Sequence, residues 1–174
     1  MNIAVVMAHL EAAAKSLTAK PSVERGASAL ERMSHGTSVT IYPLEGAAQR
    51  KGAKVARIPG TPHGFRYLLF QGRMDYAVRF SARDDEELTR MLKEFLEYLF
   101  VHRLHDADEN YIAVPEGDFR LAWHDPQGVL LDDHTLELTL SASTALYSDR
   151  ERHLIDIHVT HSIATSLEGD DLNG

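Results

Sequence analysis

The chain has 174 residues, a length typical of one domain. Hydrophobic residues make up 44% and charged residues 25%, a composition typical of globular proteins that excludes fibrous repeats and wholesale disorder. Its 18 Lys and Arg against 26 Asp and Glu give a formal net charge of −8, which disfavours nonspecific binding to nucleic acid or to an anionic membrane. The absence of cysteine excludes disulfides, thiolate metal sites and a cysteine nucleophile.

The first segment predicts an amphipathic helix. Its apolar positions recur at steps of three and four along residues 3–17, and no basic region precedes them, so the pattern favours a helix over a signal peptide. No stretch approaches the roughly 18 uncharged apolar residues that a membrane span requires. We therefore expect a soluble, intracellular protein with no membrane partner.

The next two segments predict a second helix and a first strand. Residues 21–33 predict a short helix that opens on Pro21 and ends before Gly36, with a loop as the alternative. Residues 37–42 are β-branched and aromatic, which is typical of a strand.

A long segment rich in Gly and Pro, residues 44–64, follows this strand and holds the local basic cluster of the sequence. We predict a long loop or β-arm at about 43–64, in which residues 55–58 would form a short strand. Long loops in compact domains are usually functional or mobile, so a contact surface and a solvated loop remain equal alternatives. The candidate residues for contact with a subunit or partner are Glu45, Arg50, Lys51, Lys54, Arg57 and His63.

Two strands are expected next, at residues 65–70 and 73–81. Gln71-Gly72 fits a tight hairpin connection between them. In the second strand apolar and polar residues alternate, which predicts one buried face and one wet face.

The clearest helix begins after Asp84. We expect Asp84 to cap it, with Glu87 at the third helical position, and acidic residues in its first turn suit the helix dipole. Its wide apolar stripe, from Leu88 to Phe100, should lie across a sheet. The helix is expected to end near His105.

The rest of the chain is predicted to be β. Its elements are, in order, strand 119–123, turn 125–128, strand 135–142, turn 148–151 and strand 152–163. Trp123, on the apolar side of its strand, is interpreted as a core residue. Residues 166–174 have no periodicity and should form a flexible acidic tail.

This order of elements predicts an α+β fold. Strand runs separated by a single helix suggest an antiparallel or mixed β-sheet with one long helix packed across it and an N-terminal helix. A doubly wound parallel sheet would need helices between most strands. We expect a single domain over residues 1–165.

The ten histidines suggest metal sites, but none is predicted. His102 and His105 could share a helix face with Asp106 or Asp108, yet histidine also suits the negative end of a helix, and we favour that interpretation. His158 and His161 point to opposite faces of their expected strand. We therefore predict no metal ligand.

No catalytic motif is found either. The G-x-S-x-G elbow of serine hydrolases and the glycine-rich phosphate loops are absent from the sequence. Neighbouring acids such as Asp132-Asp133 are better explained as caps and turn residues than as a catalytic pair. We predict no catalytic residue and no cofactor.

Several strings along residues 1–165 together resemble one family. They are a strand VTIYPLEG, a strand that flows into an acid-capped helix (DYAVRFSARDDEELTRMLKEFLEYL), strands FRLAWHD and LELTLSAS, and a closing strand DIHVTHSIA. This order of elements resembles the tail terminator, or tail-to-head joining, proteins of long-tailed bacteriophages and related contractile particles.

The resemblance implies a structural virion protein without a catalytic site. Its subunits would form a ring, commonly six-fold, that caps the tail tube and joins it to the connector or neck of the head, after assembly in the host cytoplasm. An acidic lumen would let DNA pass without binding, and a basic arm would suit an acidic patch on the next subunit. The alternatives are a small metal-dependent enzyme that uses His or carboxylates, and a ligand-binding α+β domain.

Overall fold

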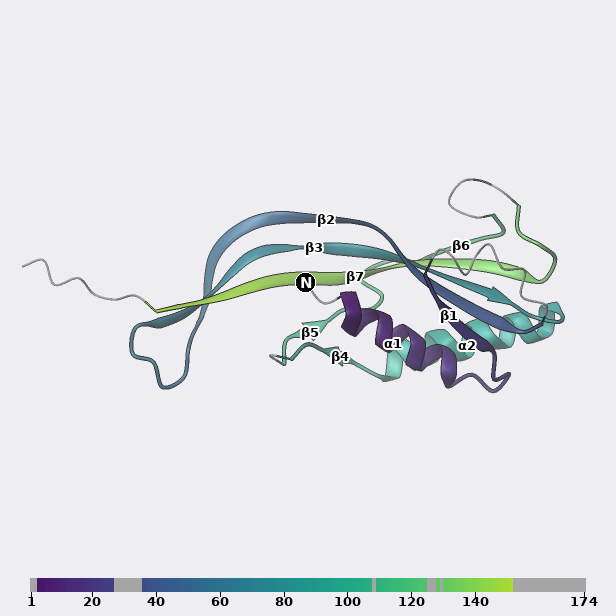
Figure 1. Cartoon of the computed structure of the whole chain (residues 1–174), viewed down its shortest axis with the longest axis horizontal. Coiled ribbons are helices and arrows are strands. Elements are labelled where there is room, and N and C mark those ends of the chain that lie inside the picture. Colours follow the sequence, from purple (N-terminus) through teal and green to yellow (C-terminus); the bar gives the residue numbers. More distant parts are fainter. Residues whose placement is uncertain (1–2, 27–35, 108, 125–127, 129, 152–174) are drawn as a thin grey trace, which may run out of the picture.

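The computed structural model describes residues 3–26, 36–107, 109–124, 128 and 130–151 (Figure 1). The expected α+β class is confirmed. A five-stranded mixed sheet has the order β1-β2-β3-β7-β6, and β4 and β5 form a separate two-stranded sheet. The elements are α1 (Ile3–Lys15), β1 (Ser22–Arg25), β2 (Ser38–Arg57), β3 (Gly64–Ser81), α2 (Asp85–Val101), β4 (Leu104–His105), β5 (Tyr111–Ile112), β6 (Arg120–Ala122) and β7 (Thr135–Glu151).

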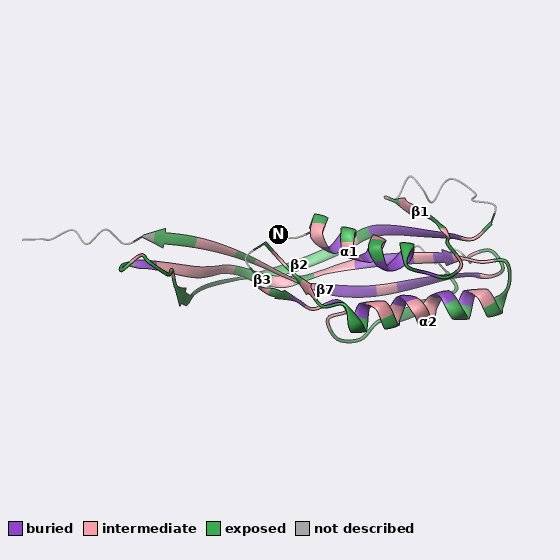
Figure 2. Cartoon of the chain, turned by 90° about the horizontal axis from the view of Figure 1, so that it is seen from below, coloured by how far each residue is buried: buried purple, intermediate pink, exposed green. Residues whose placement is uncertain are grey.

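Both helices cover the same face of the sheet, at one end of it (Figures 1 and 2). The amphipathic stripe of α1 and that of α2 meet the apolar face of β2, β3 and β7, where Phe80 and Phe95 stack edge to face with ring centroids 5.2 Å apart. Thr18 joins the two helices, since its N–H and its hydroxyl each donate to the Glu94 carboxylate over 2.8 Å. Burial of these stripes is the main force that fixes the helices on the sheet.

The start of α2 is built as the sequence predicts. The side chain of Asp84 accepts a hydrogen bond from the N–H of Glu87 at 2.8 Å. The Glu87 carboxylate accepts the N–H of Arg83 at 2.9 Å and the hydroxyl of Thr37 at 3.0 Å. The helix ends at Val101, four residues earlier than expected, because His102 turns to an extended conformation and caps it on Tyr98.

The substitution Asp84→Ala should lower the free energy of unfolding by about 1 kcal/mol, because it removes the N-cap acceptor of α2. Urea denaturation measures the effect. Asp84→Asn, which keeps an oxygen acceptor at the cap, should lose much less. Equal losses in the two variants would contradict this role of the cap.

Three strands continue far beyond the helices and form an arm (Figure 1). We define the arm as residues 43–75 and 143–151, and the body as the rest of the described chain. Residues 38–42 of β2 are buried, whereas every residue of β2 from 45 to 57 is exposed. Fifteen residues of extended chain span about 50 Å. The arm is therefore a long three-stranded ribbon without a helix packed on it among the described elements.

The predicted loop and the predicted hairpin are both corrected by this arm. Residues 44–57 are strand, so the β-arm alternative holds, and the reversal lies in residues 58–63 instead of at Gln71-Gly72. Gly72 lies inside β3, where its backbone passes so close to β2 that an added Cβ would overlap the carbonyl oxygen of Ala47 and lie 2.5 Å from the Cα of Ala48. A glycine that looks like a turn residue is here a site of close strand approach.

Three further predictions are wrong. Residues 22–25 form β1, which pairs in parallel with β2, and not a helix. Residues 148–151 continue β7 and do not form a turn. Trp123 is 58% exposed, because it directly follows β6, a three-residue edge strand that the helices do not cover. The predicted turn at 125–128 lies largely outside the described residues, and the strand at 152–163, with His158 and His161, and the tail at 166–174 lie wholly outside them.

The face of the sheet away from the helices is less exposed to solvent than predicted. Glu137 is only 2% exposed. Its Oε2 accepts a hydrogen bond of 2.6 Å from the Tyr42 hydroxyl and one of 2.9 Å from the Arg79 guanidinium. Burial and the bond to Glu137 raise the pKa of Tyr42 far above its ordinary value. This network fastens β2, β3 and β7 together at the point where the arm leaves the body.

The substitution Arg79→Met should lower the free energy of unfolding by about 2 kcal/mol, because the buried Glu137 carboxylate then keeps only the Tyr42 hydroxyl as a partner. Denaturation in urea at pH 7 measures this loss. The triple variant Tyr42→Phe/Arg79→Met/Glu137→Met removes both charges and the buried hydroxyl between them, and it should recover most of the loss. A triple variant less stable than the single one would overturn this explanation.

Candidate assembly surface on the arm

The predicted contact residues lie along the arm. Arg50, Lys51, Lys54 and Arg57 are exposed residues of β2, and His63 is exposed in the connection at its tip. Glu45 is exposed at the base, where the register between β2 and β3 shifts. Because these cations belong to a strand and not to a loop, the ladder to β3 holds their backbone in place.

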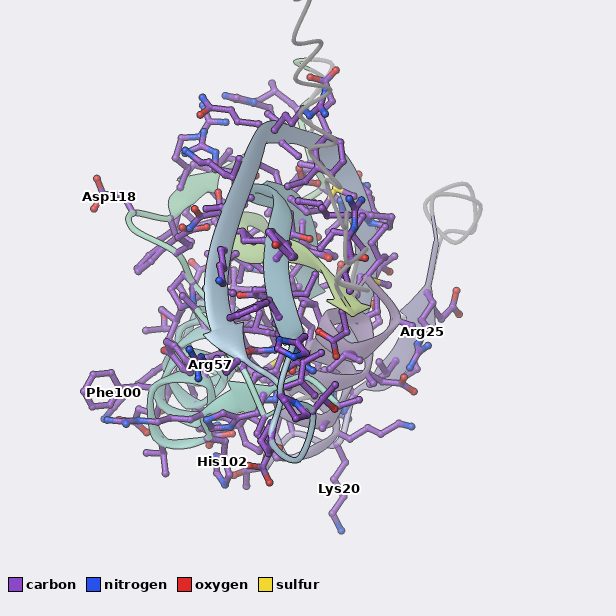
Figure 3. All side chains as sticks on the ribbon, turned by 90° about the vertical axis from the view of Figure 1, so that its left-hand side faces the viewer. Lys20, Arg25, Arg57, Phe100, His102 and Asp118 are labelled. Carbon is purple, nitrogen blue, oxygen red and sulfur yellow. The ribbon has the colours of Figure 1, made fainter. Side chains whose placement is uncertain are left out.

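The cations nearest the tip gather around one aromatic ring. Nζ of Lys54 lies 3.0 Å from the ring centroid of Phe65, and Cζ of Arg57 lies 5.7 Å from it. The negative face of the ring attracts both charges, at about 0.5–1 kcal/mol for an exposed pair. Figure 3 views the molecule from the end of the arm and labels Arg57.

Arg50 and Lys51 line different hollows of the arm. Arg50 borders one of about 450 Å³, together with Tyr67, Phe70 and Arg150. Lys51 borders another of about 340 Å³, with Arg73 and Glu116 among its neighbours. The four predicted cations therefore do not form one patch, and the structure places positive charge on more than one side of the ribbon.

Three more cations lie on the arm that sequence reasoning did not select. They come from strands β3 and β7 and are Arg66, Arg73 and Arg150. Nε of Arg66 bonds Oδ1 of Asp149 at 2.8 Å, and this guanidinium holds the pKa of the Asp149 carboxyl below its ordinary value. These three arginines lie on the arm because β3 and β7 pair alongside β2. No local pattern in the sequence predicts the register of that pairing.

Charge is distributed unevenly between the arm and the rest of the chain. The arm has seven Lys and Arg and four Asp and Glu, a net charge of +3. The remaining residues have eleven Lys and Arg and twenty-two Asp and Glu, a net charge of −11. A positive arm attached to a strongly negative remainder favours contact between the arm of one copy and the rest of another.

Both outer edges of the arm lack a partner strand within the described parts of the chain. On the β2 side, β1 pairs only with residues 38–41. On the β7 side, the last cross-strand bond beyond β6 is the one that the Ser143 N–H donates to the carbonyl of Ala113. As far as the described residues show, two long sheet edges are therefore open, an arrangement that invites pairing with another strand.

His102 and His105 do not converge on a metal site. The ring of His102 stacks on Tyr98 at 4.0 Å, whereas His105 lies beside Tyr111 with ring centroids 5.8 Å apart. Among the residues that the structure describes, no three His, Asp or Glu side chains are grouped so that they could hold a metal ion. The described helices also include none long and apolar enough to cross a bilayer.

Comparison with solved structures shows a likeness of fold. The chain is similar to the sheath/tube terminator, in its extended state, of PVC, an extracellular contractile injection system, with a TM-score of 0.51 and 12% identity over 97% of this chain. It spans 66% of the length of that protein. A second solved structure shares 13% identity over 86% of this chain and 94% of its own, with a TM-score of 0.39. No family model and no curated protein sequence matches.

Proposed function

We propose that this chain is a structural subunit of a ring that terminates the tube of a phage tail or tail-like particle. The observation that carries the proposal is the likeness of fold to a sheath/tube terminator along almost the whole chain. The open sheet edges and the basic arm beside an acidic remainder support it, because a ring needs two different surfaces that fit one another.

In this role the chain assembles with copies of itself, commonly six, in the host cytoplasm. It caps the tail tube, and in a phage it meets the connector or neck of the head. The strongly acidic character of the chain outside the arm would repel the phosphates of DNA that passes through the lumen. The subunit acts by shape and charge, without a catalytic residue or a cofactor.

Size in solution tests this function. We expect the purified 19.4-kDa chain to sediment as a species of about six subunits, alone or with the tube protein of the same particle, and to appear as rings in negative-stain images. A chain that stays monomeric at high concentration and with the tube protein present would contradict the proposal.

A further inference from the structure

The two outer edges of the arm can be followed residue by residue, because backbone groups alternate sides along a strand. The carbonyl of Ile41 accepts the N–H of Gly26 at 2.9 Å, so it points away from β3. On the other side, Ser143 donates its N–H to Ala113 at 3.0 Å and likewise points away from β3. These two bonds fix which groups face outward farther along each edge.

On β7 the alternation continues unbroken. Ser143 faces outward, so Ala145 and Tyr147 do too, and Ala142, Thr144 and Leu146 face β3. These inward residues pair with Met74, Gly72 and Phe70, whose backbone groups therefore turn toward β7 and away from β2. Their partners across β2, which are Gly46, Ala48 and Arg50, consequently expose their own backbone groups on the outer edge.

Both exposed edges have a regular stretch. Residues 46–50 of β2 pair with β3 without a shift of register, and the irregularities lie on either side of them. Residues 143–151 of β7 form an uninterrupted strand. An even row of outward N–H and C=O groups is what another strand needs for pairing.

The charges on the two edges differ in a way that selects the partner. The β2 edge continues into the cations Lys51, Lys54 and Arg57, so two β2 edges would repel one another. The β7 edge carries one cation, Arg150, beside the acid Asp149, so it has no excess of positive charge. Repulsion between like charges thus disfavours pairing of two β2 edges and leaves the β7 edge as the partner of a β2 edge.

We propose that the outer edge of β2, over residues 46–50, pairs with the outer edge of β7, over residues 144–148, of a second copy of this chain. The inference rests on the proposed function and specifies its subunit contact. Strands β2 and β7 run in the same direction within one copy, because each is antiparallel to β3. Copies related by rotation about an axis parallel to these strands would therefore pair the two edges in parallel. The edges are different, so the contact repeats from copy to copy, and both edges of every arm are paired when a ring closes.

Engineered disulfides test this contact in the full chain, which contains no cysteine of its own. Ala47 and Ala145 pair with Arg73 and Gln71, two residues apart on β3, and so point to the same face of the sheet. Within one copy β3 separates them by two strand spacings, about 10 Å, which exceeds the Cα separation of a disulfide. Any bridge between Ala47→Cys and Ala145→Cys must therefore join two copies.

The double variant Ala47→Cys/Ala145→Cys should give a ladder of covalent oligomers on non-reducing gels after mild oxidation, and a second pair, Gln49→Cys/Ala145→Cys, covers a shift of two residues in register. The matched control is Ala48→Cys/Ala145→Cys. Its two side chains point to opposite faces, so the ladder should be lost.

Each other outcome argues against the proposal. Strong covalent dimers of the single variant Ala47→Cys would show that two β2 edges meet instead. Rings that form without any ladder in either double variant would overturn the edge contact and leave the proposed function intact. A chain that shows neither rings nor ladder would contradict both.

Discussion

Replacing Gly72 with valine should lower the free energy of unfolding by about 4 kcal/mol, the largest loss that we expect from a single substitution. A Cβ at this position would overlap the carbonyl oxygen of Ala47, which belongs to backbone and not to a side chain that can turn aside. Strands β2 and β3 must separate to admit it, and the ladder of the arm is then broken near its middle.

Urea denaturation together with hydrogen exchange of peptides from residues 64–75 measures this effect. We expect the arm amides to lose most of their protection, whereas amides of α2 keep theirs. Ala48→Val is the matched control, because it adds side-chain volume at an exposed residue directly across from Gly72. Equal losses in both variants would mean that volume on the arm, and not the close approach at Gly72, is responsible.

Reversing the four cations of β2 should abolish assembly. The variant Arg50→Glu/Lys51→Glu/Lys54→Glu/Arg57→Glu changes the formal net charge from −8 to −16 and makes the arm acidic. An arm with the same sign of charge as the rest of the chain would be repelled by the next copy. We expect sedimentation velocity to show only monomer, with unchanged circular dichroism because these side chains are exposed.

The matched control reverses four exposed cations of the body, Lys20, Arg83, Arg90 and Arg103, and reaches the same net charge of −16. It should still assemble, at a somewhat higher salt concentration than the parent chain. If both variants fail to assemble, total charge decides the outcome and the arm has no special role. If the arm variant assembles like the parent, these cations do not lie at the subunit contact.

The helices were predicted from the sequence because their signals are local. Asp84 and Glu87 lie three positions apart and determine the start of α2 by contacts within a single turn. The stripe of α1 likewise needs only the helical period to be recognised. Segment 22–25 carries no such signal, and it becomes a strand because β2 offers it an edge.

The arm was only partly predicted, since its structure depends on pairing between distant residues. The composition of the basic segment predicted either a contact surface or a solvated loop, and its β-arm form was one of two alternatives. The glycines at positions 46, 52 and 72 read as loop or turn residues in isolation, yet all three lie within the β2–β3 ribbon. Trp123 was assigned to the core by its alternating pattern, which reports a face of a strand and not what covers that face.

The pairing of β3 with β7 has a consequence for how the polypeptide is made. Partners in this ladder lie between 54 and 87 positions apart in the sequence. During translation, β3 leaves the ribosome long before β7 is made. Until then the backbone groups of β3 that pair with β7, including those of Tyr76 and Val78, have no β7 partner. Long-range strand pairing of this kind forms slowly, and nascent chains can aggregate before it is complete. The ribbon is complete only once residue 151 has emerged, so a truncated or stalled product cannot present a finished arm to its neighbours.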